Sequence, residues 1–277
     1  MSIPDIRPEQ SIELLKALHI LTRDGKLNQD SRRKLKQVYH LFQFIEPLLL
    51  EAEGQGKPIS LVDHGAGKSY LGFILYDLFF KSRSQPGHIY GIETRQELVT
   101  RSEELAARCG FGGMSFLNLS VADSIHSTQL PEQVSVVTAL HACNTATDDA
   151  IRFALGKQAQ SIVLVPCCQA EVASVLRQGK GAAIRRDALA EIWRHALHTR
   201  EFGSHLTNVL RCLQLEAHGY QVTVTELVGW EHSMKNELII ARQGNHSPGR
   251  AIARLNEILD TFGLEDLRER FFVPDVH

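Results

Sequence analysis

The sequence predicts an α/β fold: a doubly wound, mostly parallel seven-stranded sheet with a C-terminal antiparallel hairpin and an N-terminal helical extension. Short apolar runs alternate with helix-like segments between residues 60 and 177, which is typical of a parallel sheet covered by helices. A glycine-rich turn follows the first run, as in sheets that bind a ligand beyond the ends of their strands. Two later runs are joined by too few residues for a crossover helix, so they should pair antiparallel.

Two helices are expected before the sheet. Residues 8–23 have an amphipathic pattern, which the Asp24-Gly25 pair should end. Four apolar side chains of this segment are available for burial: Ile12, Leu15, Leu18 and Ile20. A second helix is expected over about residues 31–44, and Pro47 should kink or end it, because proline removes a helical hydrogen bond.

The alternating segments give the order of the sheet. Five parallel strands are expected at residues 60–63, 88–93, 114–119, 134–140 and 161–166. The helices between and after them are expected at residues 70–81, 95–109, 148–157 and 171–177. A long helical stretch near residues 188–218 leads to the antiparallel strands at 221–227 and 236–242, and helices at 248–262 and 264–272 follow.

The turn after the first expected strand reads LVDHGAGKSYLG over residues 61–72. Gly65 and Gly67 can adopt positive φ and carry no Cβ, so the backbone can approach a ligand closely at the start of the next helix. A phosphate-binding P-loop would need glycine where Val62 stands. A dinucleotide loop would need its third glycine where Tyr70 stands, and that ring would hinder helix–strand packing. The turn therefore predicts a nucleotide-like cofactor held by a different loop.

The remaining pattern, D-x-G-x-G, resembles the cofactor loop of the class I (seven-stranded, Rossmann-like) methyltransferases that use S-adenosylmethionine (SAM). Five parallel strands followed by an antiparallel hairpin also resemble the topology of that family. The resemblance implies SAM as the cofactor and methyl transfer as the reaction. It also implies contacts to SAM from the turn and the next helix: Asp63, His64, Gly65, Ala66, Gly67, Tyr70 and Leu71.

Acidic residues follow the second and third expected strands. The resemblance implies that Glu93, at the end of the second strand and next to Thr94, accepts hydrogen bonds from the ribose diol of SAM. The alternative is a solvated acid at a strand end. Asp123 matches the acid that contacts the adenine amino group in this fold, and its alternative is a helix N-cap together with Ser124.

Two further motifs follow the fourth and fifth expected strands: LHACN at residues 140–144 and PCCQ at residues 166–169. With the glycine turn they resemble one branch of the family, which combines D-x-G-A-G-K-x-Y-L, L-H-A-C and P-C-C. This branch is similar to the methyltransferase domain of glutathione S-transferase C-terminal domain-containing proteins and, more distantly, to tRNA 2′-O-methyltransferases. The resemblance spans about residues 36–242. Members usually carry an acid where this chain has Asn144, so a carboxylate base is not expected there.

Three side chains are the candidates to face the transferred methyl group: His141, Asn144 and Cys167. Methyl transfer from a sulfonium is an in-line displacement, so positioning the reactants supplies much of the rate and a strong base is optional. His141 is expected beside SAM, where it either takes a proton from a hydroxyl or holds its loop by hydrogen bonds. The motif of amino-directed enzymes, [DNS]-P-P-[YFW], is absent after the fourth strand.

The cysteines allow two other interpretations. Cytosine-C5 methyltransferases attack the base with a thiolate, and Cys143 and Cys167 occupy roughly comparable places. His141, Cys143, Cys167 and Cys168 could instead converge on a metal, although adjacent cysteines lack the usual C-x₂-C spacing. We favour small buried residues that line the site, with no metal.

At 277 residues, of which 43% are hydrophobic, the chain suffices for one sizeable α/β domain with extensions. We expect a helical extension at residues 1–55, a methyltransferase domain at 56–245 and a helical tail at 246–277. The apolar runs are too short to span a membrane, and the N-terminus lacks a secretory pattern. The five cysteines fit reduced thiols, so we expect a cytoplasmic protein without a membrane partner.

The net charge of −2 argues against a general polyanion binder, yet positive charge is concentrated in two stretches. Residues 32–36 read RRKLK. The second stretch contains Arg177, Lys180, Arg185, Arg186, Arg194, Arg200 and Arg211. Trp230 could stack on a base and Lys235 could contact a phosphate. These features favour RNA (rRNA or tRNA) as the methyl acceptor, and the alternative is a set of solvated helix faces.

Two other functions stay open at this point. A methyltransferase for a small metabolite or a protein side chain would need a closed apolar pocket under the N-terminal helices. A SAM-binding scaffold without catalysis would bind the cofactor and show no turnover.

Overall fold

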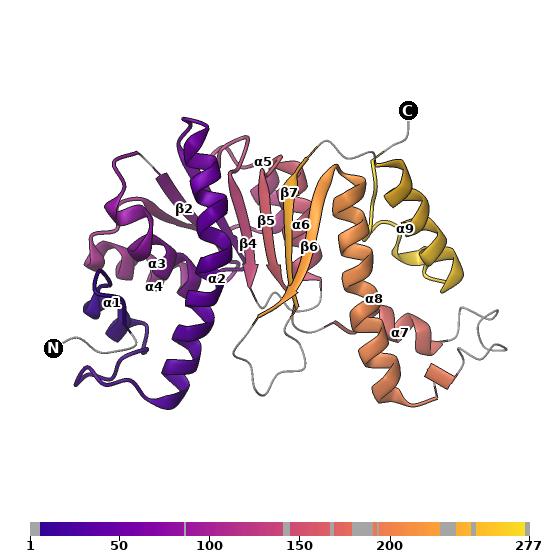
Figure 1. The fold of residues 1–277 in the computed structure, drawn as a ribbon, viewed down its shortest axis with the longest axis horizontal. Helices are drawn as coiled ribbons and strands as arrows, with labels where there is room; N and C mark the ends of the chain where they lie inside the picture. The colour runs from indigo at the N-terminus through magenta and orange to yellow at the C-terminus, as the bar shows by residue number, and fades with distance from the viewer. Residues whose placement is uncertain are drawn as a thin grey trace.

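The computed structural model shows a seven-stranded sheet with helices packed on both faces (Figure 1). It describes residues 6–85, 87–140, 145–166, 169–178, 191–192, 194–227, 237–244 and 248–274. The strands are β1 (Ile59–His64), β2 (Gly87–Ile92), β3 (Met114–Leu117), β4 (Val136–Leu140), β5 (Ser161–Val165), β6 (Tyr220–Glu226) and β7 (Glu237–Gln243). Each strand overlaps its predicted range, so the predicted fold class is confirmed.

The strand order is β3-β2-β1-β4-β5-β7-β6. Strands β1 to β5 pair in parallel, while β7 lies between β5 and β6 and is antiparallel to both. All five parallel strands therefore end at one edge of the sheet, which is the lower edge in Figure 1 and is called the carboxyl edge below. The chain leaves β1 toward β2 on one side and has β4 on the other, which makes the end of β1 the expected ligand position in such a sheet.

The helices form layers on the two faces and a third cluster at one end. They are α1 (Ile12–Ala17), α2 (Gln29–Gly54), α3 (Tyr70–Leu78), α4 (Gln96–Cys109), α5 (Val121–His126), α6 (Ala146–Gly156), α7 (Glu171–Gln178), α8 (Ala196–Ala217) and α9 (Gly249–Thr261). Side chains alternate along each strand, so Leu61 packs with the α1 to α4 layer and Val62 with Phe153 of α6 on the opposite face. Helices α7, α8 and α9 bury a separate cluster of leucines. None of the described helices is long and apolar enough to cross a bilayer.

Helix α1 is shorter than the predicted helix over residues 8–23. It ends because His19 adopts a left-handed conformation with φ +56°, which turns the chain and carries Ile20 into the core. Three of the four side chains predicted for burial are buried, whereas Ile12 is 43% exposed. The spacing of apolar residues is the same before and after the turn at His19, so the sequence pattern did not reveal where the helix ends.

Helix α2 is longer than predicted and continues through Pro47 to Gly54. Proline leaves the carbonyl oxygen of Gln43 without its helical donor, but both residues are exposed, so water can satisfy that oxygen. Leu48 and Leu49 are buried on the inner side and hold the following turns against the sheet. Of the two predicted outcomes, a kink or an end at Pro47, the end is therefore wrong.

The predicted helix over residues 264–272 is only a 3₁₀ turn, Glu265–Leu267. The side-chain amide of Gln214 donates to the carbonyl oxygens of Arg270 and Phe272, at 3.3 and 3.2 Å. These backbone acceptors are therefore satisfied by α8 rather than by helical bonds. Helix α8 itself begins at Ala196, later than the predicted stretch.

Candidate cofactor and active site

The glycine turn connects β1 to α3 at the carboxyl edge. Gly65 has φ +70° and Gly67 has φ +57°, a region in which other residues are strained. A Cβ added at Gly65 would meet no atom within 4 Å, so the space beside it is open. Ser69 also has a positive φ of +49°, and its buried hydroxyl has no hydrogen-bond partner in the part of the chain that the structure describes. Backbone strain of this kind is typical of ligand-binding turns.

Glu93 lies immediately after β2 and is 7% exposed. One carboxylate oxygen, Oε2, accepts a hydrogen bond from the Gly67 N–H at 2.9 Å, which links the end of β2 to the glycine turn. Burial raises the pKa of Glu93, but the hydrogen bonds and charge of Arg95, together with the Gly67 N–H, outweigh burial and lower the pKa to about 2. Glu93 is therefore an ionised acceptor throughout the physiological pH range.

Arg95 binds this carboxylate with its guanidinium group. Its Nε and NH2 atoms each lie 3.0 Å from one oxygen of Glu93, and its backbone N–H donates to Oε1 at 3.0 Å. A Cβ added at Gly67 would lie 3.9 Å from the NH2 atom, so the guanidinium group lies beside the glycine turn. The Arg95 side chain is 59% exposed and can leave the carboxylate at little cost.

Asp63 ends up inside the sheet, 3% exposed. Its Oδ1 atom accepts a hydrogen bond from the hydroxyl of Thr138 on β4 at 2.9 Å. Burial raises the pKa of Asp63 to about 7, although the Thr138 hydrogen bond acts in the opposite direction. The two acids of the predicted site therefore differ: Glu93 is fixed as a carboxylate, while Asp63 titrates near neutral pH.

His64 lies on the opposite face of β1 from Asp63 and is 6% exposed. Its ring packs against Phe153 of α6, with 5.4 Å between the ring centroids. Both ring nitrogens lack hydrogen-bond partners within the described residues, and burial lowers the pKa of His64 to about 4. The imidazole is therefore neutral and packs against the α6 face of the sheet at the end of β1.

The remaining predicted cofactor residues surround this point. Ala66 donates its backbone N–H to the Ile92 carbonyl oxygen at 3.0 Å. Tyr70 is half-buried at the start of α3, and Leu71 is buried in the core beneath it. Thr94 is exposed, and its carbonyl oxygen accepts a hydrogen bond from the Asn118 side chain at 2.8 Å. The Asn118 amide also donates to the Glu93 carbonyl oxygen at 3.1 Å, so it ties the end of β2 to the end of β3.

Asp123 lies in the first turn of α5, after β3, and is exposed. The helix N-cap is Ser120, whose hydroxyl accepts from the Asp123 N–H at 3.2 Å and donates to the Asp123 carboxylate at 2.5 Å. The alternative in which Asp123 and Ser124 form the cap is therefore wrong. The Asp123 residue stays exposed to solvent beside this cap.

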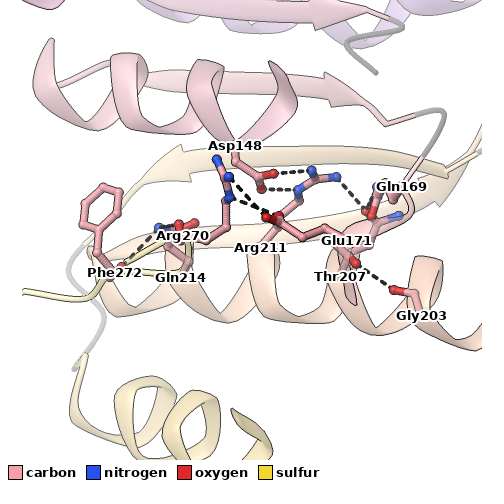
Figure 2. A network of polar contacts seen from close by, with 10 residues as sticks. Asp148, Gln169, Glu171, Gly203, Thr207, Arg211, Gln214, Arg270 and Phe272 are labelled. Carbon is pink, nitrogen blue, oxygen red and sulfur yellow. Dashed lines mark hydrogen bonds and ion pairs between the residues drawn. The ribbon is translucent and has the colours of Figure 1, made fainter. Parts of the chain in front are cut away.

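A buried polar network lies under the carboxyl edge between α6, α8 and β7 (Figure 2). Arg211 of α8 is 1% exposed and binds both oxygens of Asp148 at 2.6 and 2.7 Å. Its NH1 atom donates to Asn208 at 3.2 Å. Asn208 also accepts from the Gln169 amide at 2.7 Å and donates to the Glu237 carboxylate at 2.7 Å. The network fixes the residues that flank both motifs after β4 and β5.

The sequence did not reveal this network, and its prediction for Arg211 was wrong. Arg211 was grouped with the cations of a substrate surface, whereas it lies inside the protein and neutralises Asp148. Arg194 and Arg200 are exposed but pair with Glu191 and Glu201, at 3.2 and 2.9 Å. The only available signal was Asp148 itself, an acid at an inward-facing position of an apolar helix.

Several predicted residues lie outside the described part of the chain. These are His141, Cys143, Asn144, Cys167, Cys168, Lys180, Arg185, Arg186, Trp230 and Lys235. The described flanks show where their segments start: β4 ends at Leu140 and β5 at Val165, and these two strands are neighbours in the sheet.

The described residues fit SAM as a ligand of this edge. The open space beside Gly65 admits a ligand against the backbone, and Glu93 offers an ionised carboxylate to a diol. Asp123 is an exposed acid after the neighbouring strand β3.

Among solved structures, the fold is similar to an rRNA methylase from Streptococcus thermophilus (TM-score 0.41, 9% identity, covering 68% of this chain and 87% of that one). It is also similar to a magnesium protoporphyrin IX methyltransferase from Synechocystis PCC 6803 with bound SAH (TM-score 0.46, 13% identity, 83% and 94% coverage). A third is the Methanococcus jannaschii fibrillarin pre-rRNA processing protein (TM-score 0.43, 11% identity, 69% and 68% coverage). These similarities are too low to carry an argument about the acceptor.

No curated protein matches the chain in sequence. A family model described as a methyltransferase domain matches residues 33–175, which is just over half of the chain. The matched segment contains the glycine turn, Glu93, Asp123 and all five parallel strands, β1 to β5. The chain therefore belongs to this methyltransferase-domain family and is a SAM-dependent methyltransferase.

Proposed function

We propose that this methyltransferase acts on RNA. The observation that supports the proposal is a group of exposed cations on the first turns of α2: Arg32, Arg33, Lys34 and Lys36. Figure 1 shows that this half of α2 extends beyond the carboxyl edge, on the side where SAM is expected. A chain with a net charge of −2 has concentrated positive charge there, which suits a phosphate backbone.

The geometry of the carboxyl edge supports the following assignment of residues to SAM. Bound SAM supplies an electrophilic methyl group on a sulfonium. Glu93 accepts hydrogen bonds from the ribose diol, Asp123 from the adenine amino group, and Asp63 faces the positively charged end of the cofactor. The glycine turn gives the cofactor access to the backbone at Gly65 and Gly67.

The acceptor end of the site is assigned to His141, Asn144 and Cys167. Their segments follow β4 and β5, which are adjacent strands, and the Asp148–Arg211 network holds the flanks of both segments. In this proposal His141 takes the proton of the acceptor, while Asn144 and Cys167 position the reacting group. The motifs at residues 140–143 and 166–168 also support membership of the branch similar to the glutathione S-transferase C-terminal domain-containing proteins.

Transfer of a labelled methyl group tests the proposal. The full chain is incubated with [methyl-³H]SAM and separate pools of unmodified RNA, protein and small metabolites. We expect acid-precipitable label in the RNA pool that ribonuclease removes and that His141→Ala lowers by 10²-fold or more. Label confined to protein or metabolites would contradict the RNA proposal, and SAM binding without label in any pool would show a scaffold without catalysis.

A methyltransferase for small molecules is the second candidate. It would need an apolar pocket beneath the N-terminal helices, because a small acceptor must be enclosed. The cavity that the described residues form beneath α1 is bordered by Lys68, Arg101 and Arg108. Its charge favours an anionic acceptor over an apolar one.

A further inference from the structure

A small cavity lies between the end of α1, the start of α3 and one face of α4. Its volume is about 230 Å³. It is lined by Leu18 and His19 from the end of α1, by Lys68 and Tyr70 from the glycine turn, and by Arg101, Ser102, Leu105 and Arg108 from α4. It therefore begins directly beside the loop that we assign to SAM, on the side of the helical extension.

The cavity has an apolar floor and a cationic rim. Leu18 and Leu105 are 4% and 9% exposed, while Lys68, Arg101 and Arg108 are exposed. Arg101 and Arg108 are seven residues apart, so they lie on one face of α4, two turns from each other. Three cations therefore surround one concave surface.

These three cations are not neutralised by neighbours. Within the described ranges, no carboxylate forms an ion pair with Lys68, Arg101 or Arg108, and Glu104 is the one acid on the cavity wall. By contrast, Arg95 and Arg211 each hold a carboxylate. Three cations next to a single acid leave an excess of positive charge, so this arrangement gains energy when an anion binds.

The backbone is strained on both sides of the cavity. His19 has φ +56° and Ser69 has φ +49°, and these are two of the three non-glycine residues with positive φ among those described. The carbonyl oxygen of His19 accepts a hydrogen bond from the Ser31 hydroxyl of α2 at 3.3 Å, which holds this turn in place. Strain that is maintained on both walls of a charged cavity indicates a ligand-binding surface.

The volume of the cavity and the chemistry of its lining limit the class of ligand that it can bind. Sites for whole small molecules usually occupy about 300–1,000 Å³, so this cavity is small for a nucleoside but sufficient for a phosphate with water. The hydroxyl groups of Tyr70 and Ser102 add neutral donors to the rim. Guanidinium groups are well suited to phosphate oxygens because they can donate two parallel hydrogen bonds.

We propose that this cavity binds a backbone phosphodiester of the RNA acceptor through Lys68, Arg101 and Arg108, and so aligns the acceptor nucleotide with the methyl group of SAM. The inference rests on the proposed function, since it names the contact by which RNA would be held. The proposal also gives Lys68 of the Gly67-Lys68-Ser69 segment a role: it lines the cavity and binds the acceptor, not the cofactor.

A charge-matched pair of variants tests the site. Arg101→Gln/Arg108→Gln removes two rim charges without adding an acid to α4. The control, Arg250→Gln/Arg254→Gln, removes the same charge from α9, which lies at the opposite end of the molecule (Figure 1). Fluorescence anisotropy with a single-stranded RNA oligonucleotide is measured over a series of salt concentrations, and SAM affinity is measured by calorimetry on the same samples.

We expect the rim variant to bind RNA at least tenfold more weakly, with SAM affinity and melting temperature unchanged. Loss of the contact to this one phosphate should also lower the slope of log K against log[salt] by about 0.7. The control should change RNA affinity less than twofold. Equal loss in both variants, or an unchanged salt slope, would overturn the proposal.

The source of the phosphate is distinguished in the methyl-transfer assay. If the wild type labels RNA and the rim variant keeps its kcat/KM, the site is wrong while the RNA function stands. If the wild type labels only phosphorylated small molecules, and the rim variant loses that activity, the RNA assignment and the RNA function fail together. Inorganic phosphate at millimolar concentration should inhibit RNA binding by the wild type more than by the rim variant, and equal inhibition would contradict the site.

Discussion

Two carboxylates at one edge of the sheet are held in opposite states. Glu93 is kept ionised, because Arg95 and the Gly67 N–H stabilise its charge and lower its pKa to about 2. Asp63 is surrounded by the sheet and has one hydroxyl donor, so burial raises its pKa to about 7. Neighbouring acids with separated pKa values are typical of functional sites. Each of them leads to a measurable expectation.

Glu93 and Arg95 should affect SAM binding in opposite directions. Glu93→Ala should weaken binding on the order of 10- to 100-fold, since hydrogen bonds to a charged group contribute roughly 1.5–3 kcal/mol. Arg95→Ala should tighten binding by up to about fivefold, or about 1 kcal/mol, because Arg95 occupies the oxygens that the ribose needs and its own side chain is largely exposed. Calorimetric titration of SAM measures both.

Glu97→Ala is the matched control, because Glu97 is an exposed acid in the first turn of α4. It should leave the SAM affinity unchanged. Weaker binding in the Arg95→Ala variant would mean that Arg95 supports the cofactor site and is not displaced from Glu93.

Asp63 should make the stability of the protein depend on pH. Between the ordinary pKa of 3.8 and the raised value of about 7, the folded state holds a proton that the unfolded state has released. The free energy of unfolding should therefore fall as pH rises through this range and level off above about 7. Asp63→Asn removes this term, so between pH 5 and 8 the wild type should lose roughly 2–3 kcal/mol relative to the variant.

Urea unfolding at several pH values tests this expectation. Asp123→Asn, a change at an exposed acid in the same region, should follow the wild-type profile. Parallel profiles for wild type and Asp63→Asn would show that Asp63 has an ordinary pKa.

The helices and strands are connected under the carboxyl edge by the Asp148–Arg211 pair. It joins α6 to α8, and Asn208 extends the contact to Gln169 after β5 and to Glu237 at the start of β7. Figure 2 shows the Asp148 and Arg211 side chains pointing toward one another, with Gln169 beside them. The pair therefore determines where the segments after β4 and β5 begin.

Breaking this pair should be more costly than removing it. Arg211→Met leaves the Asp148 carboxylate buried without a partner and should lower the free energy of unfolding by about 3–5 kcal/mol. The double variant Asp148→Leu/Arg211→Met removes both charges and should recover most of that loss. Urea unfolding measures the free energy of unfolding of both variants. A double variant as unstable as the single one would contradict this expectation.

The sequence predicted the elements well where local pattern determines them. Apolar β-branched runs and the glycine turn located the strands and the cofactor loop, because both depend on neighbouring residues. It failed where distant residues decide the outcome. Pro47 does not end α2 because the inner face of the helix is held by the core. The 264–272 segment forms only a 3₁₀ turn, and its end is bound to Gln214 of the distant helix α8.

The residues of the candidate site also fall into those that local sequence predicts and those that depend on distant contacts. The positions of the glycine turn, Glu93 and Asp123 after their strands could be predicted, because strand ends and acids can be read from the chain. Arg95, Asn118 and the rim of Arg101 and Arg108 could not, since their roles depend on which elements come together. Arg211 was misassigned for the same reason: its charge is visible in the sequence, but its burial against Asp148 is not.

Across the whole molecule, two kinds of surface meet at the carboxyl edge. Asp63 and Glu93 lie at the ends of β1 and β2 next to the glycine turn, while exposed cations lie on α2 and α4. A cationic cofactor and an anionic acceptor would therefore approach from different sides of one loop. This division of charge is the central feature of the account.

The most direct test is calorimetric titration of SAM into the full chain and into Gly65→Val. The variant places a β-branched side chain at φ +70°, where it is strained and fills the open space beside the turn. We expect micromolar binding by the wild type and none by the variant, which should still unfold cooperatively but at a lower melting temperature because of the strain at residue 65. Undiminished binding by Gly65→Val, or no binding by the wild type, would contradict a SAM site at the carboxyl edge.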